Sequence, residues 1–180
     1  MKKEKTAKTE KNEKHWERVT QEFAPVCDAD CRVLILGTAP SKKSREVGFY
    51  YGHPQNRFWR VTAAVMACPV PETIEEKHAF LLSNGIALWD VIAACEIENS
   101  ADSSIRNAVA NDLSRIFASA DIHAVFTNGK TADRLYRKYI GENAVCLPST
   151  SPANAAWTLE KLIAAWGCIR VQTRPRNALI

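Results

Sequence analysis

Residues 32–59, with the sequence RVLILGTAPSKKSREVGFYYGHPQNRFW, decide the fold of this chain. They begin with an apolar run, 32–36, that predicts a buried β-strand, and they end where an apolar helical pattern starts. The loop between them, 37–55, exceeds the length of about 12–15 residues beyond which a loop inside a compact domain is usually functional. Because ligands bind beyond the carboxyl ends of the strands in open α/β sheets, we expect this loop to form the active site.

The rest of the chain alternates short apolar runs with amphipathic helical patterns. We expect further strands at 86–91, 122–127, 144–147 and 168–172, and helices at 55–67, 73–84, 108–119, 131–141 and around 159–166. Continuous apolar strands that alternate with helices are typical of a parallel sheet covered on both faces. The predicted fold class is therefore α/β: a single three-layer α/β/α sandwich with a mostly parallel central sheet of four to five strands.

The length of 180 residues is enough for one domain with a full core. We expect residues 1–20 to form a charged, flexible N-terminal tail, 21–173 to form the domain, and 174–180 to form a short C-terminal tail. No apolar run approaches the roughly 18 residues of a membrane span. The charged start also lacks the apolar segment of a secretory signal, so we expect no membrane association.

The net charge of +4 permits a nucleic-acid partner without requiring one. Of the six cysteines only Cys27 and Cys31 are close in sequence, and no second pair completes a zinc or iron–sulfur set, so we expect no metal. Cys95, Cys146 and Cys168 lie in or beside apolar runs, which predicts that they are buried. Reduced cysteines in a chain without a secretory signal indicate a cytoplasmic location.

Residues 37–44 nearly match the phosphate loop G-x4-G-K-[ST] of nucleotide-binding proteins. Lys42 replaces the second glycine, and no helical pattern follows directly, so binding of a nucleoside triphosphate is disfavoured. The sequence also contains no G-x-G-x-x-G motif. We therefore expect no nucleotide cofactor, and no cofactor of another kind.

Four loops leave the carboxyl ends of the predicted strands. They span residues 37–55, 92–107, 128–131 and 148–154. Their Ser, Thr, Asn, Lys, Tyr and His side chains suit a flat, anionic ligand with hydrogen-bonding groups, and the helix N-termini beside them favour phosphate. Of the two adjacent tyrosines, we expect Tyr50 to pack over the first helix and Tyr51 to offer a stacking face.

Three segments resemble the uracil-DNA glycosylase superfamily: GTAPS at 37–41, YGHPQNRFW at 51–59 and LPSTSPA at 147–153. The resemblance covers about residues 32–167 in the family's order and is greatest to the hypoxanthine-DNA (deoxyinosine) glycosylase branch. Further similar segments are NGIALWDV at 84–91, DSSIRN at 102–107 and NGK at 128–130.

The resemblance implies a role for individual residues. Mismatch-specific members carry a catalytic Asn in the first motif, where this chain has Ala39, so the resemblance assigns catalysis to Asn56. It implies base contacts from Thr38, Ala39, Tyr51, His53 and Asn128. It implies that one further set of residues contacts the DNA phosphates or forms a wedge that enters the duplex. The set is Ser41, Lys42, Lys43, Ser44, Lys130, Pro148, Ser149, Thr150, Ser151 and Pro152.

The implied activity is excision of a deaminated base, hypoxanthine first, from duplex DNA by base flipping and hydrolysis of the N-glycosidic bond in base excision repair. Asn56 would donate a hydrogen bond to the departing base or orient water at C1′, although its position also suits a helix cap. A Schiff-base lysine needs burial or a cationic neighbour, and although Lys42 and Lys43 are adjacent, we expect both to be solvated and to contact phosphate. We therefore expect a monofunctional enzyme, and a monomer.

Three alternatives stay open from the sequence. They are a uracil-specific or broad-specificity glycosylase, a non-catalytic module that binds damaged DNA, and a nucleotide-binding protein.

Overall fold

Strand β2 (Val33–Gly37) is buried along its whole length, next to the middle of the central sheet. The computed structural model describes residues 16–98 and 104–173. Four parallel strands follow the order β3-β2-β6-β7, where β3 is Ile86–Asp90, β6 is Ala124–Asn128 and β7 is Ala144–Leu147. The predicted α/β fold class and these four strands are confirmed, with boundaries that differ by about two residues at most.

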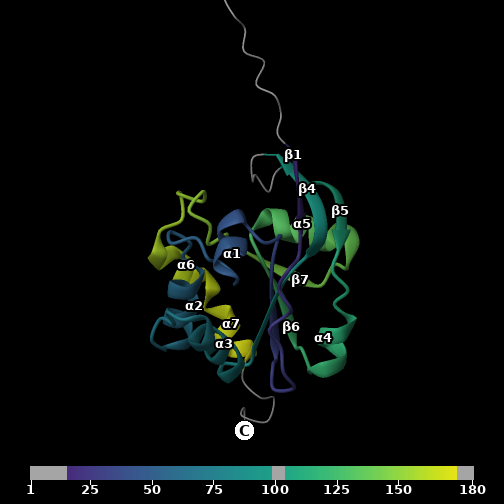
Figure 1. Cartoon of the computed structure of the whole chain (residues 1–180). Helices are drawn as coiled ribbons and strands as arrows, with labels where there is room; N and C mark the ends of the chain where they lie inside the picture. The colour runs from purple at the N-terminus through teal and green to yellow at the C-terminus, as the bar shows by residue number, and fades with distance from the viewer. Residues whose placement is uncertain (1–15, 99–103, 174–180) are drawn as a thin grey trace, which may run out of the picture.

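Side chains of β2 alternate between two hydrophobic cores, which makes the fold three-layered. Val33 and Ile35 face one core, and Leu34 and Leu36 face the other. The first core is covered by α2 (Phe58–Met66), α3 (Ile74–Ser83), α6 (Leu159–Trp166) and α7 (Cys168–Gln172). The second is covered by α4 (Ser114–Ser119), α5 (Lys130–Tyr139) and a smaller sheet, as Figure 1 shows.

The smaller sheet is antiparallel and was not predicted. Its order is β1-β4-β5, with β1 at Trp16–Thr20, β4 at Ile92–Glu98 and β5 at Arg106–Ala110. Strand β1 pairs with β4 and buries Val19, so the domain already includes residues 16–20, which we had placed in the N-terminal tail. The predicted tail segments 1–15 and 174–180 lie outside the described residues, as does part of the DSSIRN segment.

The predicted helix at 108–119 is wrong in its first half, because β5 extends to Ala110 and α4 begins only at Ser114. Two polar side chains separate the two elements. The Nδ2 atom of Asn111 donates to the backbone oxygen of Asp90 at 2.9 Å, and Oδ1 of Asp112 accepts from the backbone nitrogen of Ser114 at 2.9 Å. The bond of Asp112 is local and competes with a continuous helix, and the bond of Asn111 ties this turn to the end of β3.

The predicted fifth strand, 168–172, is helix α7. Gly167 adopts helical angles, φ −56° and ψ −25°, so the chain passes from α6 into α7 without the reversal that a strand in the sheet would require. Ile169 is buried in the core under α2. Tertiary packing has overridden the strand preference of this β-branched segment.

The predicted loop at 37–55 contains a short helix, α1 (Lys42–Val47), that the sequence reading missed. The side chain of Ser41 caps its start by accepting from the backbone nitrogen of Ser44, and Gly48 ends it in the left-handed conformation, φ 81°. A helix therefore does follow the near-phosphate loop directly, although Lys42 still occupies the place of its second glycine.

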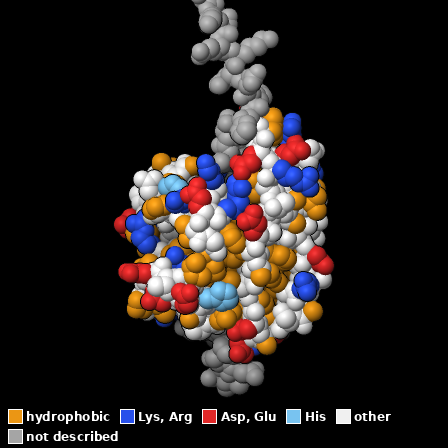
Figure 2. All heavy atoms as spheres, in the orientation of Figure 1, with side chains coloured by type: hydrophobic (Ala, Val, Ile, Leu, Met, Phe, Trp, Pro, Cys, Tyr) orange, Lys and Arg blue, Asp and Glu red, His pale blue; other side chains and the backbone are white. Residues whose placement is uncertain are grey.

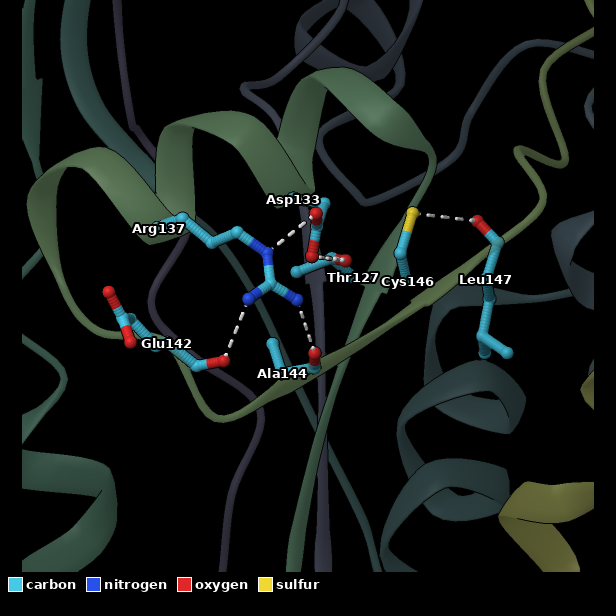
Figure 3. A network of polar contacts seen from close by, with 7 residues as sticks. All are labelled: Thr127, Asp133, Arg137, Glu142, Ala144, Cys146 and Leu147. Carbon is cyan, nitrogen blue, oxygen red and sulfur yellow. Dashed lines mark hydrogen bonds and ion pairs between the residues drawn. The ribbon is translucent and has the colours of Figure 1, made fainter.

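A polar network ties α5 to the edge strand β7 (Figure 3). Arg137 Nε donates to Asp133 at 2.9 Å, and its two terminal nitrogens each donate to a backbone oxygen at 3.0 Å, those of Glu142 and Ala144. Asp133 also accepts from the hydroxyl of Thr127 at 3.3 Å. The network fixes the turn between β6 and α5, which borders the site described below.

The cysteines are reduced, and their burial differs from the prediction. Cys95 is buried as predicted, but Cys146 and Cys168 are exposed. No group of three or more His, Cys, Asp or Glu side chains suited to a metal ion occurs within residues 16–98 and 104–173. In the same part of the chain, no helix has the length and apolar character needed to cross a bilayer.

Candidate active site

A cavity of about 430 Å³ lies beyond the carboxyl ends of three parallel strands. Gly37 of β2, Asp90 of β3 and Asn128 of β6 are the last residues of their strands, and all three line it. Its volume is within the range of about 300–1,000 Å³ that is usual for small-ligand sites. This is where a ligand is expected in an open α/β sheet.

The cavity gathers nine of the predicted site residues. They are Thr38, Ala39, Ser41, Ser44, Tyr51, Asn56, Asn128, Ser149 and Ser151. Its described lining does not include Lys42, Lys43, His53, Lys130, Pro148, Thr150 or Pro152. Lys130 and Pro148 instead border a neighbouring groove of about 700 Å³, which shares Thr38 and Asn128 with the cavity.

Tyr51 forms an aromatic wall of the cavity. Its ring stacks on the buried ring of Phe58, with centroids 3.9 Å apart and an interplanar angle of 16°. The backbone of Tyr51 is left-handed, φ 51°, a conformation that is uncommon for a bulky residue and that aims this side chain. Since Phe58 covers one face of the ring, the other face is the one that a flat ligand can use.

Tyr50 packs as predicted. It is 3% exposed, and its hydroxyl donates to the backbone oxygen of Ala24 at 2.9 Å. Burial, and then the nearby carboxylate of Asp90, raise the pKa of Tyr50 far above its ordinary value. Tyr50 is therefore a neutral structural phenol and not an acid or base at physiological pH.

A hydrogen-bond chain joins Asn56 to Asn128 through Thr150. Oδ1 of Asn56 accepts from the backbone nitrogen of Phe58 at 3.0 Å and from Oγ1 of Thr150 at 2.9 Å. Oγ1 of Thr150 in turn accepts from Nδ2 of Asn128 at 2.9 Å, and the backbone nitrogen of Thr150 donates to Oδ1 of Asn128 at 3.0 Å. Thr150 is fully buried, so it supports the site from behind and does not meet a ligand directly.

Two accepted hydrogen bonds fill the two lone pairs of the Asn56 carbonyl oxygen. One of them comes from the backbone nitrogen of Phe58, the first residue of α2, but the predicted N-cap role is wrong, because the N-cap residue is Arg57 and no side chain caps this helix. The other fixes the plane of the side-chain amide. Because the oxygen is occupied, the Nδ2 group is the part of Asn56 that can act on a ligand, and it can only donate.

Asp90 is a site residue that the sequence reading missed. It is 4% exposed, and its Oδ2 accepts from Nε2 of Gln21 at 2.7 Å. Oε1 of Gln21 accepts from the backbone nitrogen of Phe23 at 3.2 Å, which orients the Gln21 amide toward Asp90. The other oxygen, Oδ1, lies only 2.2 Å from where a Cβ on Gly37 would stand, so glycine is required there.

The acidic residue near the end of the predicted strand 86–91 was the signal for Asp90, but we assigned it no role in the site. The residue that orients Asp90, Gln21, lies far away in the sequence and carries no signal of its own.

The residues predicted to contact phosphate range from buried to exposed, and some of them are engaged with the protein. Ser44 is 3% exposed, and its hydroxyl accepts from the backbone nitrogen of Gly52 at 3.1 Å, so it stabilises the loop. Lys43 pairs with Glu46 at 2.9 Å and lowers the pKa of that carboxyl. Figure 2 shows basic and acidic side chains interspersed around α1 and β1. Lys42 and Lys130 are exposed.

His53 does not lie where we expected it. It is exposed in a turn, and its Nδ1 accepts from the backbone nitrogen of Gln55 at 3.1 Å. Its backbone oxygen accepts from the backbone nitrogen of Asn56 at 2.8 Å. The structure therefore favours a structural role in the turn over the predicted base contact.

The sequence profile of the Uracil DNA glycosylase superfamily matches residues 24–168. The chain belongs to this superfamily. It is 34% identical over 136 residues to a protein of Methanosarcina acetivorans named hypoxanthine DNA glycosylase, which covers 73% of this chain and 86% of that protein. A protein of the same name from Methanosarcina barkeri is 32% identical over 138 residues, which is 74% of this chain and 87% of that protein.

A solved structure gives the same result for the fold. A solution NMR structure from Methanosarcina acetivorans, described as a candidate uracil DNA glycosylase, superposes with a TM-score of 0.72 at 31% identity. It covers 86% of this chain and 99% of its own. This member of the uracil-DNA glycosylase superfamily is thus a DNA glycosylase, a hydrolase that acts on DNA.

Proposed function

We propose that this glycosylase excises hypoxanthine from duplex DNA, as a monofunctional enzyme of base excision repair. The observation that carries the proposal is the single cavity that brings together Tyr51, Asn56 and Asp90 at the end of the sheet. The names of the two Methanosarcina relatives support hypoxanthine as the base.

The target nucleotide has to leave the helix, because its glycosidic bond cannot be reached inside the base stack. Unpairing costs a few kcal/mol and costs least at a mismatch, such as hypoxanthine opposite thymine. We assign contacts with the DNA backbone to the exposed side chains of Lys42 and Lys130. Residues of the loop 148–154 border both the cavity and the groove. We propose that this loop is the wedge that fills the vacated space.

Inside the cavity, Tyr51 stacks on the base with the ring face opposite Phe58, and Asp90 forms a hydrogen bond with the edge of the base. Hypoxanthine carries a hydrogen on N1, whereas adenine has a lone pair there. A carboxylate only accepts hydrogen bonds, so Asp90 attracts hypoxanthine and repels adenine at that atom. Uracil has an equivalent hydrogen on N3, which is why a uracil activity is the main alternative.

The reaction breaks the bond between C1′ and the base nitrogen, and both electrons leave with the base. Water then bonds to C1′ of the cationic sugar, and its released proton balances the anionic base. Nδ2 of Asn56 donates to the base as negative charge develops on it, since its Oδ1 is already occupied. A fixed donor of this kind is a large catalytic contribution.

No lysine is part of the described cavity lining, which favours hydrolysis over Schiff-base chemistry. A covalent adduct trapped with borohydride would contradict this. Action as a monomer and in the cytoplasm stay predictions from the sequence.

A panel of duplex oligonucleotides tests the proposal. Each contains hypoxanthine, uracil, xanthine or ethenocytosine at one position, and base release is measured in single turnover. We expect the fastest release for hypoxanthine. Faster release of any other base would replace hypoxanthine as the substrate, and release of none would refute the proposal.

A further inference from the structure

Arg57 connects the entry of helix α2 to the loop that precedes α6. Its backbone nitrogen donates to the backbone oxygen of Thr150 at 3.1 Å, and its Nε contacts the same oxygen at 3.3 Å. One terminal nitrogen donates to the backbone oxygens of Ser151 at 2.6 Å and Asn154 at 3.0 Å, and the other to that of Trp157.

Four carbonyl oxygens of one irregular segment thus converge on one guanidinium. The segment 148–158 has no regular secondary structure, so its shape depends on such contacts. Other contacts also hold it: Thr150 bonds to Asn56 and Asn128, as described above, and Trp166 Nε1 donates to the backbone oxygen of Pro148. Within the segment, Asn154 Nδ2 donates to the backbone oxygen of Ser149. None of the ion pairs among the described residues involves Arg57. The side-chain hydrogen bonds of Arg57 described above all go to this segment.

The same segment also holds the catalytic candidate. Thr150, whose carbonyl oxygen Arg57 binds, donates its hydroxyl hydrogen to Asn56. Arg57 is the next residue in the chain after Asn56. The loop and the amide of Asn56 are therefore fixed by one guanidinium and one threonine.

We propose that Arg57 is a positioning residue that sets the shape of the segment 148–158, which contains the proposed wedge 148–154, before DNA binds. The energy of DNA binding is then used for base flipping and not for ordering the loop. A loop ordered in advance lowers the cost of binding. The proposal rests on the proposed function, because it assumes that this loop enters the duplex. It assigns Arg57 no contact with the base.

The proposal predicts that the effect of replacing Arg57 depends on how the target base is paired. If Arg57 supports base flipping, replacing it should lower the excision rate most where flipping costs the most free energy. The effect should be smallest where the base is already unpaired. A general loss of folding would reduce excision from all substrates by the same factor.

The test uses Arg57→Lys, which keeps the charge but cannot span four carbonyls, since an ammonium lacks the rigid fork of a guanidinium. Single-turnover excision of hypoxanthine is measured opposite cytosine, opposite thymine, opposite an abasic-site analogue and in single-stranded DNA. Arg60→Ala is the matched control, because Arg60 is an exposed cation on the same helix. Asn154→Ala, which removes the hydrogen bond from Nδ2 of Asn154 to the backbone oxygen of Ser149 within the loop, is the second variant.

We expect Arg57→Lys to lower the excision rate roughly 100-fold opposite cytosine, the order of loss that a misplaced site residue causes. The loss should shrink stepwise along the series to about threefold in single-stranded DNA, where no flipping is needed. Asn154→Ala should show the same trend more weakly, and Arg60→Ala should show no trend.

An equal loss on every substrate for both Arg57→Lys and Asn154→Ala would overturn the inference while leaving the proposed function intact. No excision of hypoxanthine by the unmodified protein from any of the four substrates would refute the proposed function itself, and this inference with it.

Discussion

Replacing Thr150 by valine removes the hydroxyl that joins Asn56 to Asn128 and changes little else. The two side chains have nearly the same shape, and Thr150 is fully buried, so no cavity forms. Two hydrogen bonds of 2.9 Å disappear, one donated to Asn56 and one accepted from Asn128. The variant therefore isolates the polar network from packing.

The magnitude follows from those two bonds. The bond to Asn56 contributes about 0.5–1.5 kcal/mol of net stability, and leaving the buried Nδ2 of Asn128 without its acceptor costs about 1–3 kcal/mol. We expect Thr150→Val to lower the free energy of unfolding by about 2–4 kcal/mol. Because Asn56 loses one of its two anchors, we also expect the excision rate to fall about tenfold or more.

Urea unfolding and single-turnover excision of hypoxanthine measure the two effects. Thr150→Ser is the control, because it keeps the hydroxyl and removes only a buried methyl, at a cost of about 1 kcal/mol. We expect it to excise hypoxanthine at close to the unmodified rate. If Thr150→Val matched Thr150→Ser in both stability and rate, the network would have no role in holding Asn56.

Three further predictions concern the cavity and its rim. Gly37→Ala should lower the free energy of unfolding by about 1–3 kcal/mol, because its Cβ would stand 2.2 Å from Oδ1 of the buried Asp90. Asp90→Asn should reduce excision of hypoxanthine about tenfold or more relative to unsubstituted purine, which lacks the N1 hydrogen, as expected for a hydrogen bond to a charged group. Lys42→Ala should reduce the salt dependence of DNA binding by about one phosphate contact, a slope change of about 0.9, and Lys43→Ala should reduce it less, because Lys43 pairs with Glu46.

Each of these predictions has a contrary result. An unchanged urea midpoint for Gly37→Ala would mean that the carboxylate moves aside freely. Equal losses on hypoxanthine and purine after Asp90→Asn would make Asp90 a structural residue. An unchanged salt slope for Lys42→Ala, measured by fluorescence anisotropy, would place the DNA backbone elsewhere.

The parts of the fold that the sequence predicted are those whose pattern is complete within a few residues. Strand β2 is apolar throughout because both of its faces are buried, and α3 begins with a capping box between Thr73 and Glu76 that its sequence displays. The parts that were missed depend on distant partners. Strand β1 exists because it pairs with β4, and 168–172 is helical because Gly167 continues α6.

The residues of the site also fall into those that the sequence predicted and those that it missed. Loop length and position pointed to the segment that carries Tyr51 and Asn56, and both line the cavity. Asp90 and Arg57 were missed because their surroundings come from far along the chain. Gln21, which orients Asp90, is 69 residues away, and the carbonyl of Thr150 that Arg57 binds is 93 residues away. Such pairs form only in the folded chain.

The central claim is that Asn56 acts by donating a hydrogen bond from Nδ2 to the departing base. Asn56→Asp tests it most directly, because aspartate keeps an oxygen that can accept from the backbone nitrogen of Phe58 and from Thr150, while it replaces the donor by a negatively charged acceptor. With a melting temperature close to that of the unmodified protein, we predict that the single-turnover rate on hypoxanthine falls by about 10²–10³-fold, the cost of removing one such donor. A folded Asn56→Asp protein that excises hypoxanthine at nearly the unmodified rate would contradict the account.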